Sequence, residues 1–204
     1  MKKSGKFIYS TKWLTYTALL TALVVATGFI TPITTPAGRI YWVDGMVLIT
    51  AYLMDPLSAF IAGGVGTLLY DLLKSPAMMI PSLFIHGLQG ATVSALLHYV
   101  LPQKREALFA LVASLAGAVI VVGGYFLYRT MIYGAATAVA SIPRNLIQEA
   151  IGITIAMLLC YATTLKRQLA KNHLLPDFQR EVKSRKNPSP DDGESGHMQN
   201  SQTS

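Results

Sequence analysis

The chain has 204 residues, of which 52% are hydrophobic and only 13% are charged, and its mean hydropathy is +0.43. A soluble domain is usually about 45–50% apolar and about 25% charged. A large soluble core would also raise the apolar content, so the length of the uncharged runs is used to distinguish a soluble protein from a membrane protein. The net charge of +7 permits nucleic-acid binding but does not require it, and we expect no nucleic-acid partner.

Two uncharged runs are long enough to cross a membrane. Residues 13–30 and 107–126 contain no Asp, Glu, Lys or Arg. About 20 helical residues span the hydrocarbon core, so such runs predict transmembrane helices. Pro- and Gly-rich breaks then divide the chain into six spans. We predict an all-α integral membrane protein, a six-transmembrane-helix bundle with spans near 13–31, 43–54, 57–74, 80–101, 106–128 and 142–166.

The basic residues predict the orientation. Thirteen of the 17 lysines and arginines fall on the side that holds both ends of the chain. Because positive charge concentrates in cytoplasmic loops, both termini are predicted to be cytoplasmic, in a cell-membrane protein. A cleaved signal peptide is the alternative for the first run. The predicted organisation is a cytoplasmic segment at 1–12, the membrane domain at 13–166, and a largely disordered cytoplasmic tail at 167–204, which is polar and Pro/Ser/Asp-rich.

Polar residues gather at one level of the predicted bundle. Ionisable groups inside spans are costly and are functional candidates. Alternating helix directions bring the following to the outer half of the membrane: Asp44, Asp71, Ser82, His86, Gln89, Asn145, Gln148 and Glu149. A binding pocket open to the outside is one interpretation, and hydrogen bonding between helices is the other. The sequence has no HExxH motif and no Cys/His cluster, so we expect neither a metal nor a cofactor.

The sixth span begins with the unusual stretch "IPRNLIQEAIG". Pro143 suits the first turn of a helix, which would direct the positive end of the helix dipole at the pocket. Asn145, Gln148, Glu149 and Gly152 recur at helical spacing and define one face. Arg144 points about 100° away from Asn145, so contact with the ligand stays open for Arg144 and for Glu149.

Two further segments carry candidate functions. The loop "TPAGRIYW" supplies Arg39, Tyr41 and Trp42, which would either cover the pocket and stack on a flat ligand or form an aromatic belt at the membrane surface. On the first span, small residues repeat every four positions and permit close helix approach, either for internal packing or for docking to another membrane protein. They are Ala18, Ala22 and Ala26. Arg129 and Tyr133 are interpreted as interface anchors.

These motifs resemble, in order and spacing, the substrate-binding S components of energy-coupling factor (ECF) vitamin transporters. The resemblance rests on Asp44 opening the second span, the Asp55-Pro56 turn, the Gly-rich third span ending in "DLL", and the stretches "IPSLFIHGLQG" and "IPRNLIQEAIG". The alanine stripe matches the small-residue motif of the family's first helix. Residues 12–165 are covered, and the nearest branch is the hydroxymethylpyrimidine and pyridoxine type.

The resemblance implies a division of labour. The chain would capture a vitamin or vitamin precursor from outside and dock through the alanine stripe on a transmembrane T component coupled to two ATP-binding subunits. The sequence has no GxxxxGK[ST] loop, so ATP hydrolysis would be done by these partners and the chain is not expected to be an enzyme. The alternatives are a structural or assembly subunit with a polar helix seam, and a membrane-embedded enzyme using Asp71, His86 and Glu149.

Overall fold

The structure is a computed structural model that describes residues 11–30, 33–35, 38–100, 105–163 and 168. Most of the predicted N-terminal segment 1–12 and almost all of the tail 167–204 lie outside the described residues. The elements in chain order are α1 (Thr11–Phe29), β1 (Ile33–Thr35), β2 (Gly38–Ile40), α2 (Val43–Leu53), α3 (Pro56–Phe60), η1 (Ile61–Val65), α4 (Gly66–Lys74), η2 (Pro76–Met78), α5 (Met79–Ala95), η3 (Leu96–Val100), α6 (Glu106–Tyr133), α7 (Ala135–Met157) and η5 (Leu158–Ala162).

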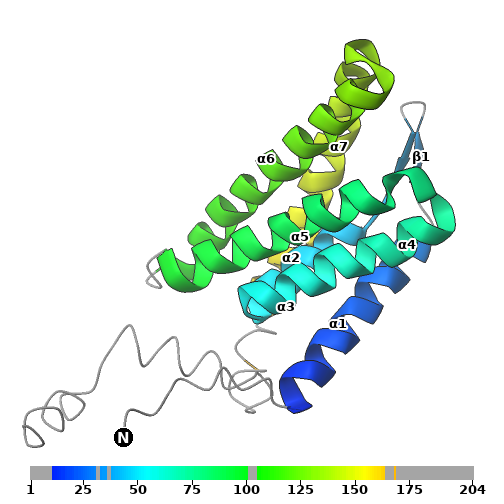
Figure 1. The fold of residues 1–204 in the computed structure, drawn as a ribbon. Helices are drawn as coiled ribbons and strands as arrows, with labels where there is room; N and C mark the ends of the chain where they lie inside the picture. The colour runs from blue at the N-terminus through cyan, green and yellow to red at the C-terminus, as the bar shows by residue number, and fades with distance from the viewer. Residues whose placement is uncertain (1–10, 31–32, 36–37, 101–104, 164–167, 169–204) are drawn as a thin grey trace, which may run out of the picture.

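The helices pack as one bundle with six crossings (Figure 1). Helix α3 continues through η1 into α4 as a single crossing, and α5 and α7 continue into the π-helical turns η3 and η5. Five described segments are long and apolar enough to cross a membrane, and α2 is a shorter apolar helix. The predicted bundle is therefore confirmed, including its short second span. The antiparallel hairpin of β1 and β2, with Ile33 opposite Ile40, is an addition that the all-helical prediction lacked.

The bundle is apolar outside as well as inside. Large apolar side chains point outward along its length, with Val119 at 72% and Leu127 at 64% exposed. Apolar side chains are stable in the hydrocarbon of a bilayer, but backbone N–H and C=O groups there need hydrogen bonds within the protein. Helices supply these hydrogen bonds, so the helical crossings are compatible with a bilayer. Helix α2 lies at the centre of the bundle, and every residue from Val47 to Leu53 is buried.

Two glycines permit the close packing of η1 and α3 on α5. A methyl group added at Gly63 would lie 2.6 Å from the carbonyl oxygen of His86, and one at Gly90 would lie 2.6 Å from that of Ala59. Any side chain here would force the helices apart. The small-residue stretch "AGGVG" therefore serves internal packing, whereas the alanines of α1 have a different environment, described below.

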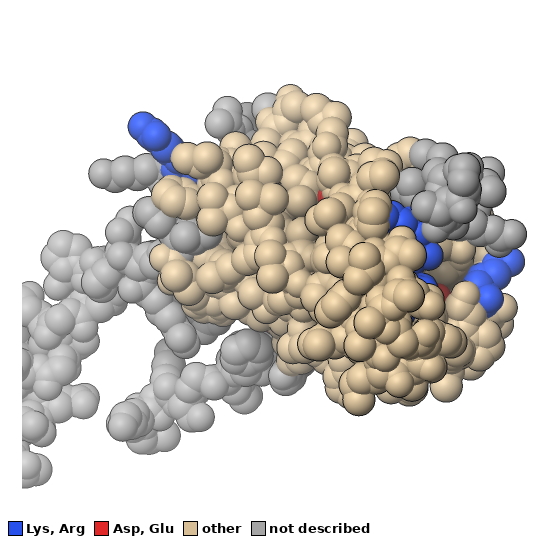
Figure 2. All heavy atoms as spheres, turned by 90° about the horizontal axis from the view of Figure 1, so that it is seen from above, with Lys and Arg blue, Asp and Glu red and all other residues tan. Residues whose placement is uncertain are grey.

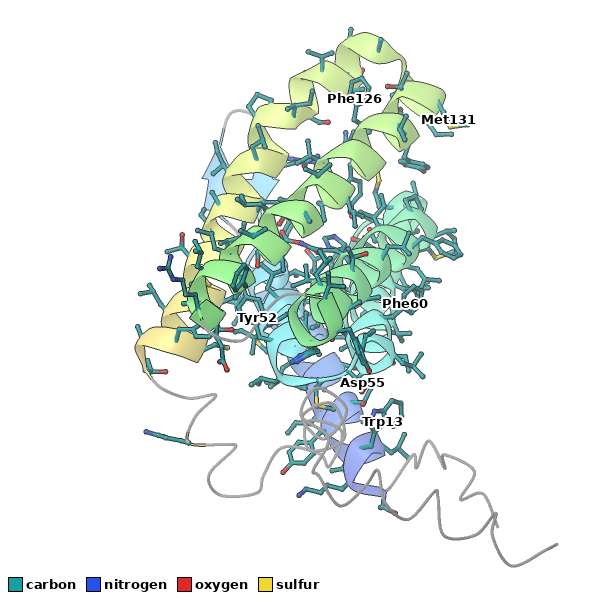
Figure 3. All side chains as sticks on the ribbon, turned by 90° about the vertical axis from the view of Figure 1, so that its left-hand side faces the viewer. Trp13, Tyr52, Asp55, Phe60, Phe126 and Met131 are labelled. Atoms are coloured by element: carbon teal, nitrogen blue, oxygen red, sulfur yellow. The ribbon has the colours of Figure 1, made fainter. Side chains whose placement is uncertain are left out.

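The turn between α2 and α3 lies at the inner end of the bundle, opposite the polar cluster. Asp55 caps α3 by accepting from the backbone N–H groups of Leu57 and Ser58, and Pro56 follows at the first helical position. Asp55 Oδ1 also accepts from Trp13 Nε1 at 2.6 Å, so the cap joins α1 to α3. Figure 3 shows Trp13 and Asp55 side by side at this end.

The last two helices differ from their predicted boundaries. Helix α6 continues to Tyr133, and α7 begins at Ala135 rather than at residue 142. Gly134 alone makes the connection, with a φ of 84° that favours glycine. Pro143 therefore lies inside α7. Its prediction as a first-turn residue is wrong, and so is the expectation that the helix dipole begins beside Asn145.

Candidate substrate-binding site

Polar side chains from five helices meet at the end of the bundle that the charge pattern places outside. Almost all are buried: Asp44, Ser82 and Gln89 are fully enclosed, and His86, Asn145 and Glu149 are 2–4% exposed. Figure 2 views this bundle from above, where the surface is mostly uncharged and most of the visible basic and acidic atoms lie toward the right-hand end, the end of the β1–β2 hairpin in Figure 1. The hydrogen bonds that join most of these residues are described next.

A chain of hydrogen bonds runs from α4 through α5 to α6. Ser82 Oγ donates to Asp71 Oδ2 and lies 2.7 Å from the hydroxyl of Tyr125. That hydroxyl lies 3.1 Å from His86 Nε2. The rings of His86 and Tyr125 also meet edge to face, with centroids 5.7 Å apart. Tyr125 was missed by the sequence analysis, although a hydroxyl-bearing side chain near the outer end of an apolar span is a usable signal.

The chain continues from His86 to α7. Nδ1 of His86 lies 3.1 Å from Gln89 Oε1, and Gln89 Nε2 donates to both carboxylate oxygens of Glu149 at 3.0 Å. Glu149 thus shares the network with His86 and is not paired with Arg144.

A second branch joins α2 to α7 and to the segment before α2. Asp44 Oδ1 lies 3.1 Å from His86 Nδ1 as an ion pair, while Asp44 Oδ2 accepts from Gln148 Nε2 at 2.6 Å. Gln148 Oε1 in turn accepts from the backbone N–H of Tyr41 at 3.3 Å. Gly152 permits this approach, because a methyl group there would lie 2.9 Å from Asp44 Cβ. The predicted face of Asn145, Gln148, Glu149 and Gly152 is therefore confirmed.

The two ring nitrogens of His86 face different partners. Nε2 faces the Tyr125 hydroxyl, which also lies within hydrogen-bond distance of Ser82 Oγ. Nδ1 faces the Gln89 carbonyl oxygen and the Asp44 carboxylate, which are both acceptors. His86 is thereby held between Asp44 and the Tyr125 hydroxyl.

Two polar atoms of the network are left without partners. Asp44 Oδ1 and Asn145 Nδ2 are buried, and neither has a hydrogen-bond partner among the described residues. The Asp44 oxygen has its ionic contact to His86 but not the geometry of a hydrogen bond. Leaving a buried polar atom unpaired costs free energy, so the site offers one acceptor and one donor.

The aromatic residues at the entrance are half-buried. The ring of Tyr41 packs edge to face on Tyr70, with centroids 5.5 Å apart, and Trp42 lies beside it in the chain at the start of α2. The β2 backbone includes Arg39, but the side chain of Arg39 lies outside the described part of the chain. The predicted place of Arg39 over the pocket therefore stays a prediction.

The alanine stripe lies on the outside of the bundle. Ala18, Ala22 and Ala26 are all exposed, unlike the glycines of η1. An apolar groove of about 360 Å³ runs along this face of α1 and is bordered by η1 and α4. Its lining includes Trp13, Thr17, Ala18, Ala22, Ile61 and Leu69. Internal packing does not explain the stripe.

Comparison with known proteins places the chain in a family. The family model for the S component of the ECF-type riboflavin transporter matches residues 8–166. The thiamine precursor transporter HmpT of Lactococcus lactis subsp. cremoris (strain MG1363) is 33% identical over 152 residues, covering 72% of this chain and 85% of HmpT. An uncharacterized protein from the gap 3′ region of Pyrococcus woesei is 30% identical over 124 residues, covering 61% of this chain and 81% of that protein.

Solved structures share the fold. The S component of a bacterial ECF transporter matches with a TM-score of 0.54 and 19% identity, covering 78% of this chain and 96% of that one. FolT bound with folic acid matches with a TM-score of 0.50 and 20% identity, covering 74% and 93%. The chain belongs to the S components of ECF-type transporters.

Family membership defines the activity class. The chain is the membrane-embedded, substrate-binding subunit of an ECF-type vitamin importer and works with a T component and two ATP-binding subunits. It is a transport subunit and not an enzyme.

Proposed function

We propose that the network at the outer end of the bundle is the substrate site, and that its substrate is a thiamine precursor or a closely similar amine-bearing heterocycle. The observation that carries this proposal is the pair of buried atoms without a hydrogen-bond partner: Asn145 Nδ2, and Asp44 Oδ1, whose contact is the ion pair with His86. An aminopyrimidine presents an exocyclic N–H donor and a ring-nitrogen acceptor, which complement that pair.

The names of the relatives refer to two vitamins and one vitamin precursor, so these names alone do not select a substrate. The family model names riboflavin, HmpT is a thiamine precursor transporter, and FolT holds folic acid. HmpT combines 33% identity with coverage of 72% of this chain, whereas FolT supports the fold alone. The flavin ring system has no exocyclic amine to offer to Asp44, which favours the aminopyrimidine.

The alanines of α1 complete the proposal as the docking face for the T component. Ala18, Ala22 and Ala26 present no side chain beyond a methyl group, so a partner helix is able to approach closely. The groove beside them gives room for apolar side chains of that helix.

Mass spectrometry of the ligand retained by the purified chain tests the substrate directly. We expect an aminopyrimidine, and titration calorimetry with hydroxymethylpyrimidine, riboflavin and folic acid should give tight binding only with the first. Retention of a flavin, or tighter binding of riboflavin, would refute the proposed substrate class.

A further inference from the structure

Two arginines outside the hydrogen-bonded chain lie at the outer rim of the site. Arg129 is four residues beyond Tyr125 on α6, and residues four apart share a helix face. Arg144 directly precedes Asn145 on α7. It also lies within electrostatic range of Arg129, Tyr125 and Tyr41. The two guanidinium groups therefore belong to one region, next to the Tyr125 end of the network.

Neither arginine is neutralised by an acidic residue. Among the described residues, no carboxylate lies within ion-pair distance of Arg129 or Arg144. The Nε atoms of Arg129 and Arg144 are both buried without a hydrogen-bond partner. Arg144 Nη2 donates to Asn145 Oδ1 at 3.1 Å, which leaves its Nε unused. Two neighbouring cations with unused donors repel each other unless an anion lies between them.

The charges of the site are separated by depth. Arg144 precedes Glu149 by five residues on α7, which is about 7.5 Å along a helix with a rise of about 1.5 Å per residue. Arg129 lies beyond Tyr125 on a helix that runs outward. The two arginines therefore lie nearer the rim than Asp44 and Glu149, which lie further in beside His86 and Gln89, while the Asp71 carboxylate is bound to Ser82 at the Tyr125 end of the network. A ligand that matches both levels carries its amine inward and a negative group outward.

We infer that Arg129 and Arg144 form an anion subsite for an oxyanion carried by the substrate, so that the preferred substrate is the phosphate monoester of the heterocycle. This inference rests on the proposed function, because the network has to hold the heterocycle for its substituent to reach the rim. Guanidinium groups bind phosphate oxygens through paired N–H donors, and the two unpaired Nε–H groups are available for this. Arg129 is then a specificity residue and not only an interface anchor.

Calorimetry on the purified full chain in detergent tests this inference. The ligands are hydroxymethylpyrimidine and its phosphate monoester, titrated into wild type, R129Q, R144Q and the double variant. We expect wild type to bind the phosphate ester at least about tenfold more tightly than the neutral compound, and the double variant to lose this preference. K74Q is the matched control: Lys74 is an exposed basic residue at the same end whose ammonium lies over the Phe29 ring, and its removal should leave the preference intact.

The outcomes separate this inference from the proposed function. If both compounds bind equally in wild type, or if the preference persists in the double variant, the anion subsite is refuted while the heterocycle site stands. If neither compound binds, the proposed substrate is refuted. In that case the melting temperature is compared in inorganic phosphate and in chloride at matched ionic strength. A higher melting temperature in phosphate supports the anion subsite without the heterocycle, and equal melting temperatures refute it.

A lipid headgroup offers the same phosphate chemistry. Wild type and the double variant are therefore also compared in nanodiscs of phosphatidylcholine with and without phosphatidylglycerol. Retention of phosphatidylglycerol by wild type only, without discrimination between the two heterocycles, would assign the arginines to lipid and overturn the substrate subsite.

Discussion

His86 connects three helices through its two ring nitrogens. Nε2 reaches Tyr125 on α6, while Nδ1 reaches Asp44 on α2 and Gln89 on its own helix. Asp44 Oδ1 lies 3.1 Å from Nδ1, so a protonated His86 would have its opposite charge beside it. The site is thus a fully connected scaffold with a small number of open positions for a ligand.

Asn145 should contribute directly to ligand affinity. Its buried Nδ2 has no partner among the described residues, so a ligand acceptor is its natural complement. Asn145→Ala should weaken binding by about 1–3 kcal/mol, the cost of one lost buried hydrogen bond. Titration calorimetry measures this, with Thr154→Ala as the control because Thr154 is exposed on the same helix. An unchanged dissociation constant would remove Asn145 from the site.

Tyr125→Phe should damage the scaffold more than the ligand contacts. The substitution removes the hydrogen bonds of the Tyr125 hydroxyl to Ser82 Oγ and to His86 Nε2, while the ring remains. We expect a loss of stability of about 1–3 kcal/mol, seen as a lower melting temperature. Tyr128→Phe is the control, since Tyr128 bonds only the carbonyl of Ala77 at the exposed surface. Equal melting temperatures for wild type and Tyr125→Phe would contradict a stabilising role for the hydrogen bonds of Tyr125 to Ser82 and His86.

The sequence analysis predicted which polar residues lie in this part of the bundle, but not which of them pair. The helical spacing of Asn145, Gln148 and Glu149 defined a face, and burial of that face followed from the cost of polar groups in lipid. The partners are far apart along the chain, with Gln89 and Glu149 separated by 60 residues and Asp44 and Gln148 by 104. Such pairing depends on the rotation of each helix in the bundle, which no local pattern encodes.

Helix α1 is held at its inner end by hydrogen bonds to the α2–α3 turn. Trp13 Nε1 and Ser58 Oγ both donate to Asp55 Oδ1, at 2.6 and 2.5 Å, and Thr17 Oγ1 donates to Ser58 Oγ at 2.9 Å. Trp13 and Thr17 also line the groove beside the alanine stripe. The capping carboxylate of α3 therefore fixes the position of the proposed docking face.

Trp13→Phe should impair docking while sparing substrate binding. It removes the donor to Asp55 but keeps an aromatic ring in the groove, and a hydrogen bond to a charged group contributes about 1.5–3 kcal/mol. Co-purification of the T component should fall about tenfold, with unchanged substrate affinity at the opposite end of the bundle. Thr15→Val is the control, because Thr15 is exposed and bonds only its own helix. Normal co-purification would show that the Asp55 contact does not position α1 for docking.

Ala22→Leu tests the docking face itself. Ala22 is exposed at the groove, so a larger side chain would fill part of the groove without disturbing the core and would separate a partner helix from α1. Uptake should be strongly reduced and ligand binding retained. Ala107→Leu, an exposed alanine on α6, should have no effect. Parallel loss of binding and uptake would instead indicate misfolding.

Pro143 illustrates the limit of prediction at the level of elements. Proline favours a first helical turn, and the stretch from residue 130 to 141 is rich in small residues, so a connection followed by a helix start was the reasonable prediction. The structure instead leaves only Gly134 between the two helices and carries Pro143 within α7. Proline is tolerated inside membrane helices, where neighbouring groups satisfy the freed carbonyl.

The proposed substrate site and the anchored end of the proposed docking helix lie at opposite ends of the bundle. The polar network and the arginine pair lie at one end, and the Asp55 turn with the anchored end of α1 lies at the other. An importer that captures substrate outside and is driven by ATP-binding subunits inside needs this polarity. Its direction rests on the distribution of lysine and arginine, which places the network outside.

Labelling of single cysteines tests that direction. In a Cys160→Ala background, Ala136→Cys in the exposed start of α7 should react with a membrane-impermeant maleimide added to intact cells. Arg105→Cys, exposed at the start of α6, should react only after the membrane is opened, because the α5–α6 connection faces the cytoplasm. Cys160 is buried in the native chain, so its replacement also removes slow background labelling. The reverse pattern would place the network on the cytoplasmic side, where it would bind and release substrate on the wrong face for import.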